Sequence, residues 1–211
     1  GKELTESAIR SGLPKTLVRL AKAEWLDRFG YGKVARLFAD SAGACSPAMV
    51  DVAVELAIPI DELGDEQYHA VAADEKEADL TANPKGKTAL ANLAQSYNCD
   101  DEETRRLATA RRLLAQGADP NRRDQGGETA VFNVENPDLL RLLYAHGANG
   151  SVKDRQGRSP VFSSWTDEIV LLHLQNGASP EGRDERGATL RQLMKKHPMP
   201  KASRWLSDHG Y

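Results

Sequence analysis

Few side chains in this 211-residue sequence combine reactive chemistry with a spacing that would support it. Cys45 lies in the segment GACSP, directly before a predicted helix start, where the helix dipole favours a thiolate. Cys99 lies among carboxylates in the segment YNCDDEE, and these disfavour a thiolate. Two cysteines are too few for a disulfide scaffold, although a single bridge between them stays open. We interpret Cys45 as a small buried side chain near a turn, and a catalytic thiol at Cys45 is the alternative.

The histidines give no predicted metal site, because no two of them have the spacing of metal ligands. They are His69, His146, His173, His197 and His209. His146 directly precedes Gly147 at a predicted helix end, so we predict a polar capping role for it. The sequence contains no GxSxG, HExxH, Walker or dinucleotide-binding motif. We therefore expect a protein without catalytic activity, cofactor or metal.

A regular spacing relates the aspartates that could otherwise suggest acid–base chemistry. Asp124, Asp154 and Asp184 follow one another at intervals of 30 residues. The same interval separates Gly117, Gly147 and Gly177. A residue that recurs in every unit suits a structural contact better than a single reaction, so we predict that each aspartate ties its turn to the neighbouring turn. The spacing defines a second unit over 124–153, a third over 154–183 and a last over 184–211, and a first unit opens at Asn83.

Each unit predicts a turn followed by two helices. The turn glycines suit a positive φ, and the hydroxyl two residues later is predicted to cap the first helix. These hydroxyls belong to Thr129, Ser159 and Thr189. The second helix carries apolar residues at three- and four-residue spacing, for example over 139–143 and 169–174. We predict that these stripes are buried between adjacent units and that glycines such as Gly147 end the helices in the left-handed conformation.

The segments GADPNRRD, TALANLA, TAVF and SPVF resemble the turn and the first-helix opening of the ankyrin-repeat family. The resemblance covers residues 83–211. It implies an all-α solenoid of about four units, with the first expanded by QSYNCDDEETRR and the last a cap that has Arg191 at an apolar position. The family period is about 33 residues. A period of 30 therefore predicts shorter helices, or a tighter connection between them, in the middle units.

Residues 1–82 show a helical pattern that resembles no family we recognise. We expect helices from Pro14 to before Gly30, over 34–38, from Pro47 to before Pro59, and over 65–73. No Gly/Ser/Pro-rich linker separates this part from residue 83 onward. We therefore predict two parts, a helical segment over 1–82 and a repeat domain over 83–211, with the first stacked on the second.

Charge and hydropathy narrow the class of partner. The net charge of −3 is too small to demand nucleic acid or a membrane surface, and no apolar run approaches the roughly 20 residues of a membrane span. We expect a cytoplasmic protein, or a periplasmic one if a signal peptide has been removed. Residues 51–79 form an acidic run, which is either a solvated face or a docking surface for a basic partner. Its candidate contacts are Asp61, Glu62, Asp65 and Glu66.

The resemblance implies a concave side, built from turns and first helices, that binds another protein. The candidate contacts on the turns are Arg122, Arg123, Lys153, Arg155, Arg158, Arg183 and Arg186. Those on the first helices are Asn133, Glu135, Ser163 and Trp165. Trp165 is the strongest candidate, because it lies at a short connection where a large ring is hard to bury and because tryptophan dominates many interfaces. Packing of Trp165 on a neighbouring unit is the alternative.

The sequence therefore predicts a non-enzymatic protein–protein interaction module. A narrower hypothesis is a bacterial immunity protein that neutralises a secreted toxin, since compact ankyrin proteins with an extra helical segment resemble such inhibitors. The alternatives are a general ankyrin scaffold with another protein partner and an enzyme that uses Cys45. The oligomeric state stays open.

Overall fold

The computed structural model describes residues 38, 45–58, 60–61, 87–95 and 103–211. Within them the chain forms seven α-helices, one short 3-10 helix and no β-strand, which confirms the predicted all-α class for this part. The elements in chain order are α5 (Pro47–Glu55), α6 (Ala89–Gln95), α7 (Glu103–Ala115), α8 (Pro137–Ala145), η4 (Pro160–Phe162), α9 (Asp167–Gln175), α10 (Leu190–Lys196) and α11 (Pro200–Asp208).

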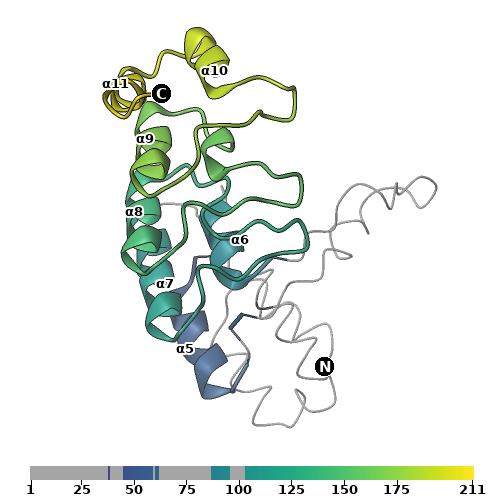
Figure 1. The fold of residues 1–211 in the computed structure, drawn as a ribbon. Coiled ribbons are helices and arrows are strands. Elements are labelled where there is room, and N and C mark those ends of the chain that lie inside the picture. The colour runs from purple at the N-terminus through teal and green to yellow at the C-terminus, as the bar shows by residue number, and fades with distance from the viewer. Residues whose placement is uncertain (1–37, 39–44, 59, 62–86, 96–102) are drawn as a thin grey trace, which may run out of the picture.

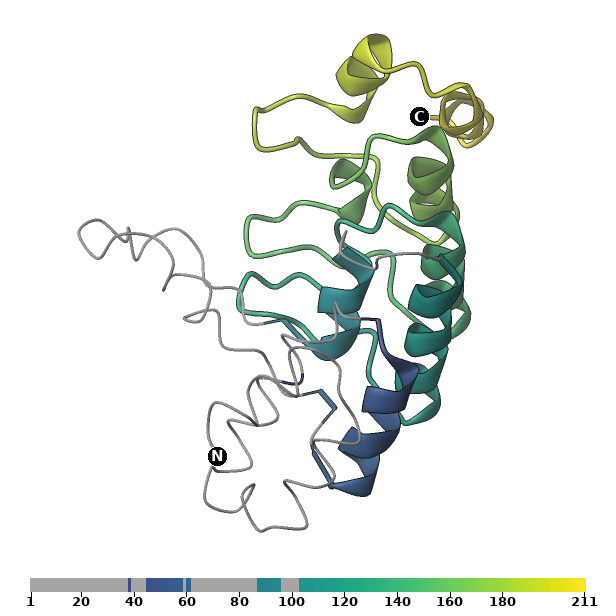
Figure 2. The ribbon, with the colours of Figure 1, turned by 180° about the vertical axis from the view of Figure 1, so that it is seen from behind.

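Five of the helices stack into one outer column. Contacts run from α5 to α7, from α7 to α8, from α8 to α9 and from α9 to α11, so the column follows the chain order. Helices α6 and α10 lie beside this column, with η4 between them, and long turns project from the same side (Figures 1 and 2). The molecule is thus built from units that each contribute an outer helix, an inner element and a turn.

Helix α8 shows how the sequence sets the ends of an outer helix. Pro137 occupies the first turn, and the side chain of Asn136 accepts a hydrogen bond of 2.8 Å from the backbone N–H of Leu139. The chain leaves the helix through Gly147, whose φ of +82° is in the left-handed region. His146 occupies the C-cap position predicted for it, and its backbone N–H donates to carbonyl oxygens of the last turn.

The leucine-rich stripes form the core between units, as predicted. Leu139, Leu140 and Leu143 on α8 are completely buried. Helix α9 faces two ways: Ile169 belongs to the core shared with α8, whereas Val170 belongs to the core shared with α10 and α11. The stacking of neighbouring units therefore removes from water the apolar surface that no single unit could bury.

The inner elements of the two middle units are much shorter than those of the flanking units. Helices α6 and α10 have seven residues each. The second unit has only a turn at 130–133, and the third has the three-residue η4. Residues 131 and 132 and residues 161 and 162 nevertheless remain buried. The shortening that the 30-residue period predicted is thus most pronounced in the inner layer, although α8 and α9, with nine residues each, are also shorter than the 13-residue α7.

The predicted hydroxyl caps are only partly confirmed. Thr189 caps α10 by accepting from the N–H of Gln192, and the Gln192 side chain bonds back to the cap residue. The hydroxyls of Thr129 and Ser159 are instead buried and have no hydrogen-bond partner. The prediction was wrong there because a single turn or 3-10 turn does not present the backbone N–H that an α-helix offers at its third residue.

Helix α5 begins at Pro47, as predicted, but it ends at Glu55, earlier than Pro59. The chain turns away at Ala57, which has a positive φ of 53°. Helix α5 contributes to the same core as α6, α7 and α8. Part of the predicted N-terminal segment therefore stacks on the repeat units. The helices expected over 14–29 and 65–73, and all of the helix expected over 34–38 except Phe38, lie outside the described residues.

Two findings bear on the alternatives left by the sequence. Cys45 is buried and disulfide-bonded, so it offers no free thiol for the catalytic alternative. Cys99 lies outside the described residues. Among the helices that the structure describes, none has the length and apolar character required to cross a bilayer.

Candidate functional site

The shortened inner layer leaves a groove of about 480 Å³ on the side from which the turns project. Its walls come from the second, third and last units. The apolar and uncharged part of the lining comprises Phe132, Asn133, Ser159, Phe162, Ser163 and Trp165. The titratable part comprises Glu128, Asp154, Arg158, Asp184, Glu185, Arg186 and His197. We call this pocket the groove, and its position over η4 follows directly from the missing helix turns.

The repeated aspartates shape the turns that form one wall of the groove. The carboxylate of Asp154 accepts hydrogen bonds of 2.9 Å from the backbone N–H groups of Gln156 and Arg158. Asp184 makes the same pattern with its own turn, and Asp124 accepts from Glu128. For Asp154 and Asp184 the prediction of a tie between neighbouring turns was wrong, because each carboxylate organises the turn to which it belongs.

Adjacent turns are joined by other groups. The backbone N–H of Arg155 donates to the carbonyl of Gly126 at 2.9 Å, and a side chain on Gly127 would meet that same nitrogen at 3.0 Å. Nη1 of Arg123 donates to the carbonyl oxygens of Gly127 and Lys153. The second and third turns are therefore fixed to each other by the main chain and by one guanidinium group.

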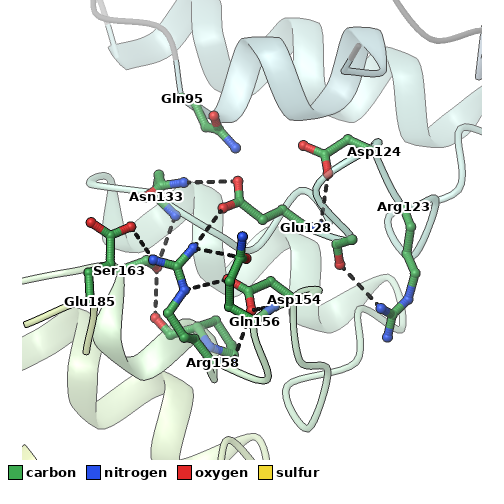
Figure 3. Close-up of polar contacts among 12 residues, drawn as sticks. Gln95, Arg123, Asp124, Glu128, Asn133, Asp154, Gln156, Arg158, Ser163 and Glu185 are labelled. Atoms are coloured by element: carbon green, nitrogen blue, oxygen red, sulfur yellow. Dashed lines mark hydrogen bonds and ion pairs between the residues drawn. The ribbon is translucent and has the colours of Figure 1, made fainter. Parts of the chain in front are cut away.

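Arg158 links three turns from the centre of the groove wall (Figure 3). Its Nε lies 2.6 Å from a carboxylate oxygen of Asp154, and its Nη1 contacts Glu185 of the last unit. Its Nη2 lies 3.9 Å from Glu128 of the second unit. The Arg158 side chain is only 19% exposed. The expected exposure of Arg158 was wrong, because its guanidinium group lies among carboxylates of three units, and its contact with a partner stays a prediction.

Trp165 lies at the mouth of the groove and is 52% exposed. The residue follows η4 and directly precedes Thr166, whose side chain caps α9 by accepting from Ile169. This short connection leaves the indole no place in the core. The ring of His197 lies 5.5 Å from the indole ring at an angle of 55°. The predicted exposure of Trp165 is thus confirmed.

The other predicted contacts fall into two groups. Asn133 lines the groove, with a positive φ of 58°, and its backbone N–H donates to the hydroxyl of Ser163 at 3.0 Å. Its side-chain amide lies 3.4 Å from a carboxylate oxygen of Glu128. Glu135, Arg122, Arg123, Lys153 and Arg155 are exposed but do not belong to the groove lining. The groove lining therefore brings together five of the predicted contacts, Asn133, Arg158, Ser163, Trp165 and Arg186, and the other described ones lie outside it.

The acidic run contributes contacts within the chain where the structure describes it. Both carboxylate oxygens of Asp61 accept from the backbone N–H of Asp119 at 3.1 Å, and partial burial raises the pKa of Asp61. Asp51 pairs with Arg112 on α7. Asp61 is therefore hydrogen-bonded within the chain, and its role as a docking contact stays a prediction. Glu62, Asp65 and Glu66 lie outside the described residues.

Sequence reasoning did not assign the acidic residues of the groove or His197 to a binding site. The sequence does contain a signal for Glu128, because Glu128 and Arg158 occupy the same position in consecutive units and carry opposite charges. Such a pair can interact when equivalent positions stack. His197 gave no comparable signal, because it follows α10 where the last unit departs from the repeat.

No protein-family model matches the chain, and no curated protein sequence matches it. Among the described residues no three His, Cys, Asp or Glu side chains are grouped to hold a metal ion. The groove offers a half-exposed indole, carboxylates organised by backbone N–H groups, and a buried Ser159 hydroxyl without a hydrogen-bond partner. These groups suit non-covalent binding of a polar side chain.

Proposed function

We propose that this chain is an ankyrin-type repeat protein that binds another protein through the groove, without catalysis. The observation that carries the proposal is the position of Trp165, a large ring more than half exposed at the mouth of a groove of about 480 Å³. Tryptophan contributes strongly to binding energy when a partner covers it. Among the described residues the other large hydrophobic side chains that are comparably exposed, Val54 and Tyr211, do not belong to the groove.

The rigidity of the groove supports the proposal. Asp154 is fixed by two backbone N–H groups and by Arg158, which also contacts Glu185 and Glu128 of the adjoining units. Adjacent turns are linked by a backbone hydrogen bond between Arg155 and Gly126. A surface that is already ordered loses little conformational entropy when a partner binds, and this favours affinity.

The narrower hypothesis of an immunity protein rests on the resemblance and on the acidic run. Because Asp51 and Asp61 are engaged within the chain, we base the binding proposal on the groove and not on that run. The disulfide at Cys45 favours an oxidising compartment such as the periplasm over the cytoplasm. A periplasmic inhibitor of a secreted toxin agrees with the resemblance and with the disulfide at Cys45. We retain the immunity hypothesis in this form.

Affinity capture tests the proposal. The wild-type chain, Trp165→Ala and Tyr211→Ala are immobilised and exposed to extract from the native host and to its secreted proteins. Tyr211→Ala is the matched control, since Tyr211 is 46% exposed but lies at the C-terminus outside the groove. We expect a protein that the wild type and Tyr211→Ala retain and that Trp165→Ala loses. Retention of the same proteins by all three chains would contradict binding through the groove.

The toxin hypothesis requires a further result. The captured protein should have a toxic activity that the purified chain blocks at about one-to-one stoichiometry. A captured protein without such activity would leave the general scaffold as the better description.

A further inference from the structure

The charged lining of the groove is dominated by carboxylates. Four acidic side chains face two guanidinium groups, an excess of two negative charges. The acidic residues are Glu128, Asp154, Asp184 and Glu185, and the basic ones are Arg158 and Arg186. Carboxylates near a low-dielectric wall attract cations more strongly than the same groups do in water.

The ion pairs in the groove also favour a cationic ligand. Arg158 contacts Asp154 and Glu185 directly and lies near Glu128, so an anion that approached Arg158 would have to displace carboxylates of this chain. Glu185, in contrast, is largely exposed to solvent. Its side chain is 78% exposed although one of its oxygens contacts Arg158, so it can accept hydrogen bonds from a second cation.

Two uncharged groups complete the environment. Indole is the aromatic ring that attracts cations most strongly, and Trp165 leaves more than half of its surface exposed beside these carboxylates. The hydroxyl of Ser159 lines the groove, is buried and has no hydrogen-bond partner within the chain.

We propose that the groove binds an arginine side chain of the partner protein, with the guanidinium stacked on Trp165 and hydrogen-bonded to Glu185. This inference rests on the proposed function and specifies its chemistry. Arginine fits better than lysine because its planar group stacks on aromatic rings and presents several N–H donors in one fork to a carboxylate. A carboxylate side chain of a partner would instead meet like charge inside the groove.

A peptide selection tests the inference with the full chain. A phage-displayed library of random peptides is selected on the wild type, on Trp165→Ala and on Glu185→Gln. Glu181→Gln is the matched control, because Glu181 is exposed on the same loop region but lies outside the groove. We expect the wild type and Glu181→Gln to enrich arginine-containing peptides. Synthetic copies of those peptides should bind Trp165→Ala and Glu185→Gln at least about fivefold more weakly.

Variation of the peptide then identifies the group that binds. Replacement of the selected arginine by citrulline, which keeps the shape but not the charge, should weaken binding at least about tenfold. Replacement by lysine should weaken it less. Trp165→Phe should bind with intermediate affinity, since a phenyl ring attracts cations less than indole does. Circular dichroism of each variant checks that its fold is unchanged.

The outcomes separate this inference from the proposed function. Selected peptides that require Trp165 but carry no common basic residue would overturn the arginine inference and leave the groove as a docking surface. Lysine-containing peptides that bind as tightly as their arginine counterparts would overturn the preference for arginine. Peptides that bind all variants equally would overturn both proposals.

Discussion

The phenol oxygen of Tyr144 on α8 and Nδ1 of His173 on α9 lie 2.6 Å apart, and this hydrogen bond joins two consecutive units. The two rings meet edge to face, with centroids 6.0 Å apart. His173 is completely buried, and its Nε2 has no hydrogen-bond partner. Burial lowers the pKa of His173 to about 3 and raises the pKa of Tyr144. His173 is therefore neutral in the folded chain near neutral pH.

This burial predicts acid sensitivity. The unfolded chain binds a proton at His173 below its ordinary pKa of 6.5, whereas the folded chain does so only near pH 3. The stabilisation is therefore fully present above pH 6.5 and is lost as the pH falls from 6.5 towards 3. We expect the free energy of unfolding to fall by up to about 1.4 kcal/mol per pH unit in this range because of this residue. Urea unfolding of the wild type and of His173→Leu between pH 7.5 and pH 5 measures the difference. Parallel pH profiles for the two proteins would contradict the assignment.

The stacked leucines predict a cavity effect. Leu143 on α8 is completely buried, so Leu143→Ala should lower the free energy of unfolding by about 2–5 kcal/mol. Leu142, on the same helix, is only partly buried. Leu142→Ala is the matched control and should cost clearly less. Equal losses in denaturant unfolding of the two variants would mean that the interface between units is misassigned.

The loop after α8 predicts a steric effect. A Cβ atom on Gly150 would lie 2.1 Å from the carbonyl oxygen of Asn176 and 2.8 Å from its carbonyl carbon. Backbone atoms cannot rotate out of the way as a side chain can, so we expect Gly150→Ala to lower the free energy of unfolding by at least about 1–3 kcal/mol. The exposed neighbour Ser151 provides the control, and Ser151→Ala should change stability by less than about 0.5 kcal/mol. A thermal unfolding curve of Gly150→Ala that coincides with that of the control would refute the close approach.

The ion pairs of Arg158 predict that it contributes more to the free energy of unfolding than the nearby Arg155 does. Arg158→Met removes the partner of Asp154, whose side chain is only 1% exposed. The two backbone N–H groups that bind Asp154 remain, so we expect a loss of about 1–3 kcal/mol instead of the larger cost of an isolated buried charge. Arg155→Met changes an exposed side chain and should be close to neutral. Chemical unfolding of both variants at one pH decides this, and equal stability would show that the Arg158 network contributes nothing.

The features predicted correctly from the sequence are those set by residues close together in the chain. The left-handed glycines at 117, 147 and 177, the buried leucine stripe of α8 and the start of α5 at Pro47 all depend on local conformation or helical periodicity. The exposure of Trp165 was predictable for the same reason, since only a short connection separates η4 from α9.

The errors concern contacts between residues that are distant in sequence. Asp61 and Asp119 are separated by 58 residues, and Arg158 and Glu185 by 27. A single sequence gives the charges of such residues but not their partners, so engaged side chains were predicted as free contacts. The error at the hydroxyls of Thr129 and Ser159 has a different cause. The inner element is shortened there, so the helix that these hydroxyls would cap is missing.

The most direct test of this account is the affinity of the captured partner for Trp165→Ala relative to Tyr211→Ala, measured together with the unfolding free energy of both variants. We predict that Trp165→Ala binds the partner at least about fivefold more weakly, or about 1 kcal/mol, while its stability changes by less than about 0.5 kcal/mol. Tyr211→Ala should bind like the wild type. An unchanged affinity for Trp165→Ala, or a loss of affinity that its loss of stability explains, would contradict a binding groove centred on Trp165.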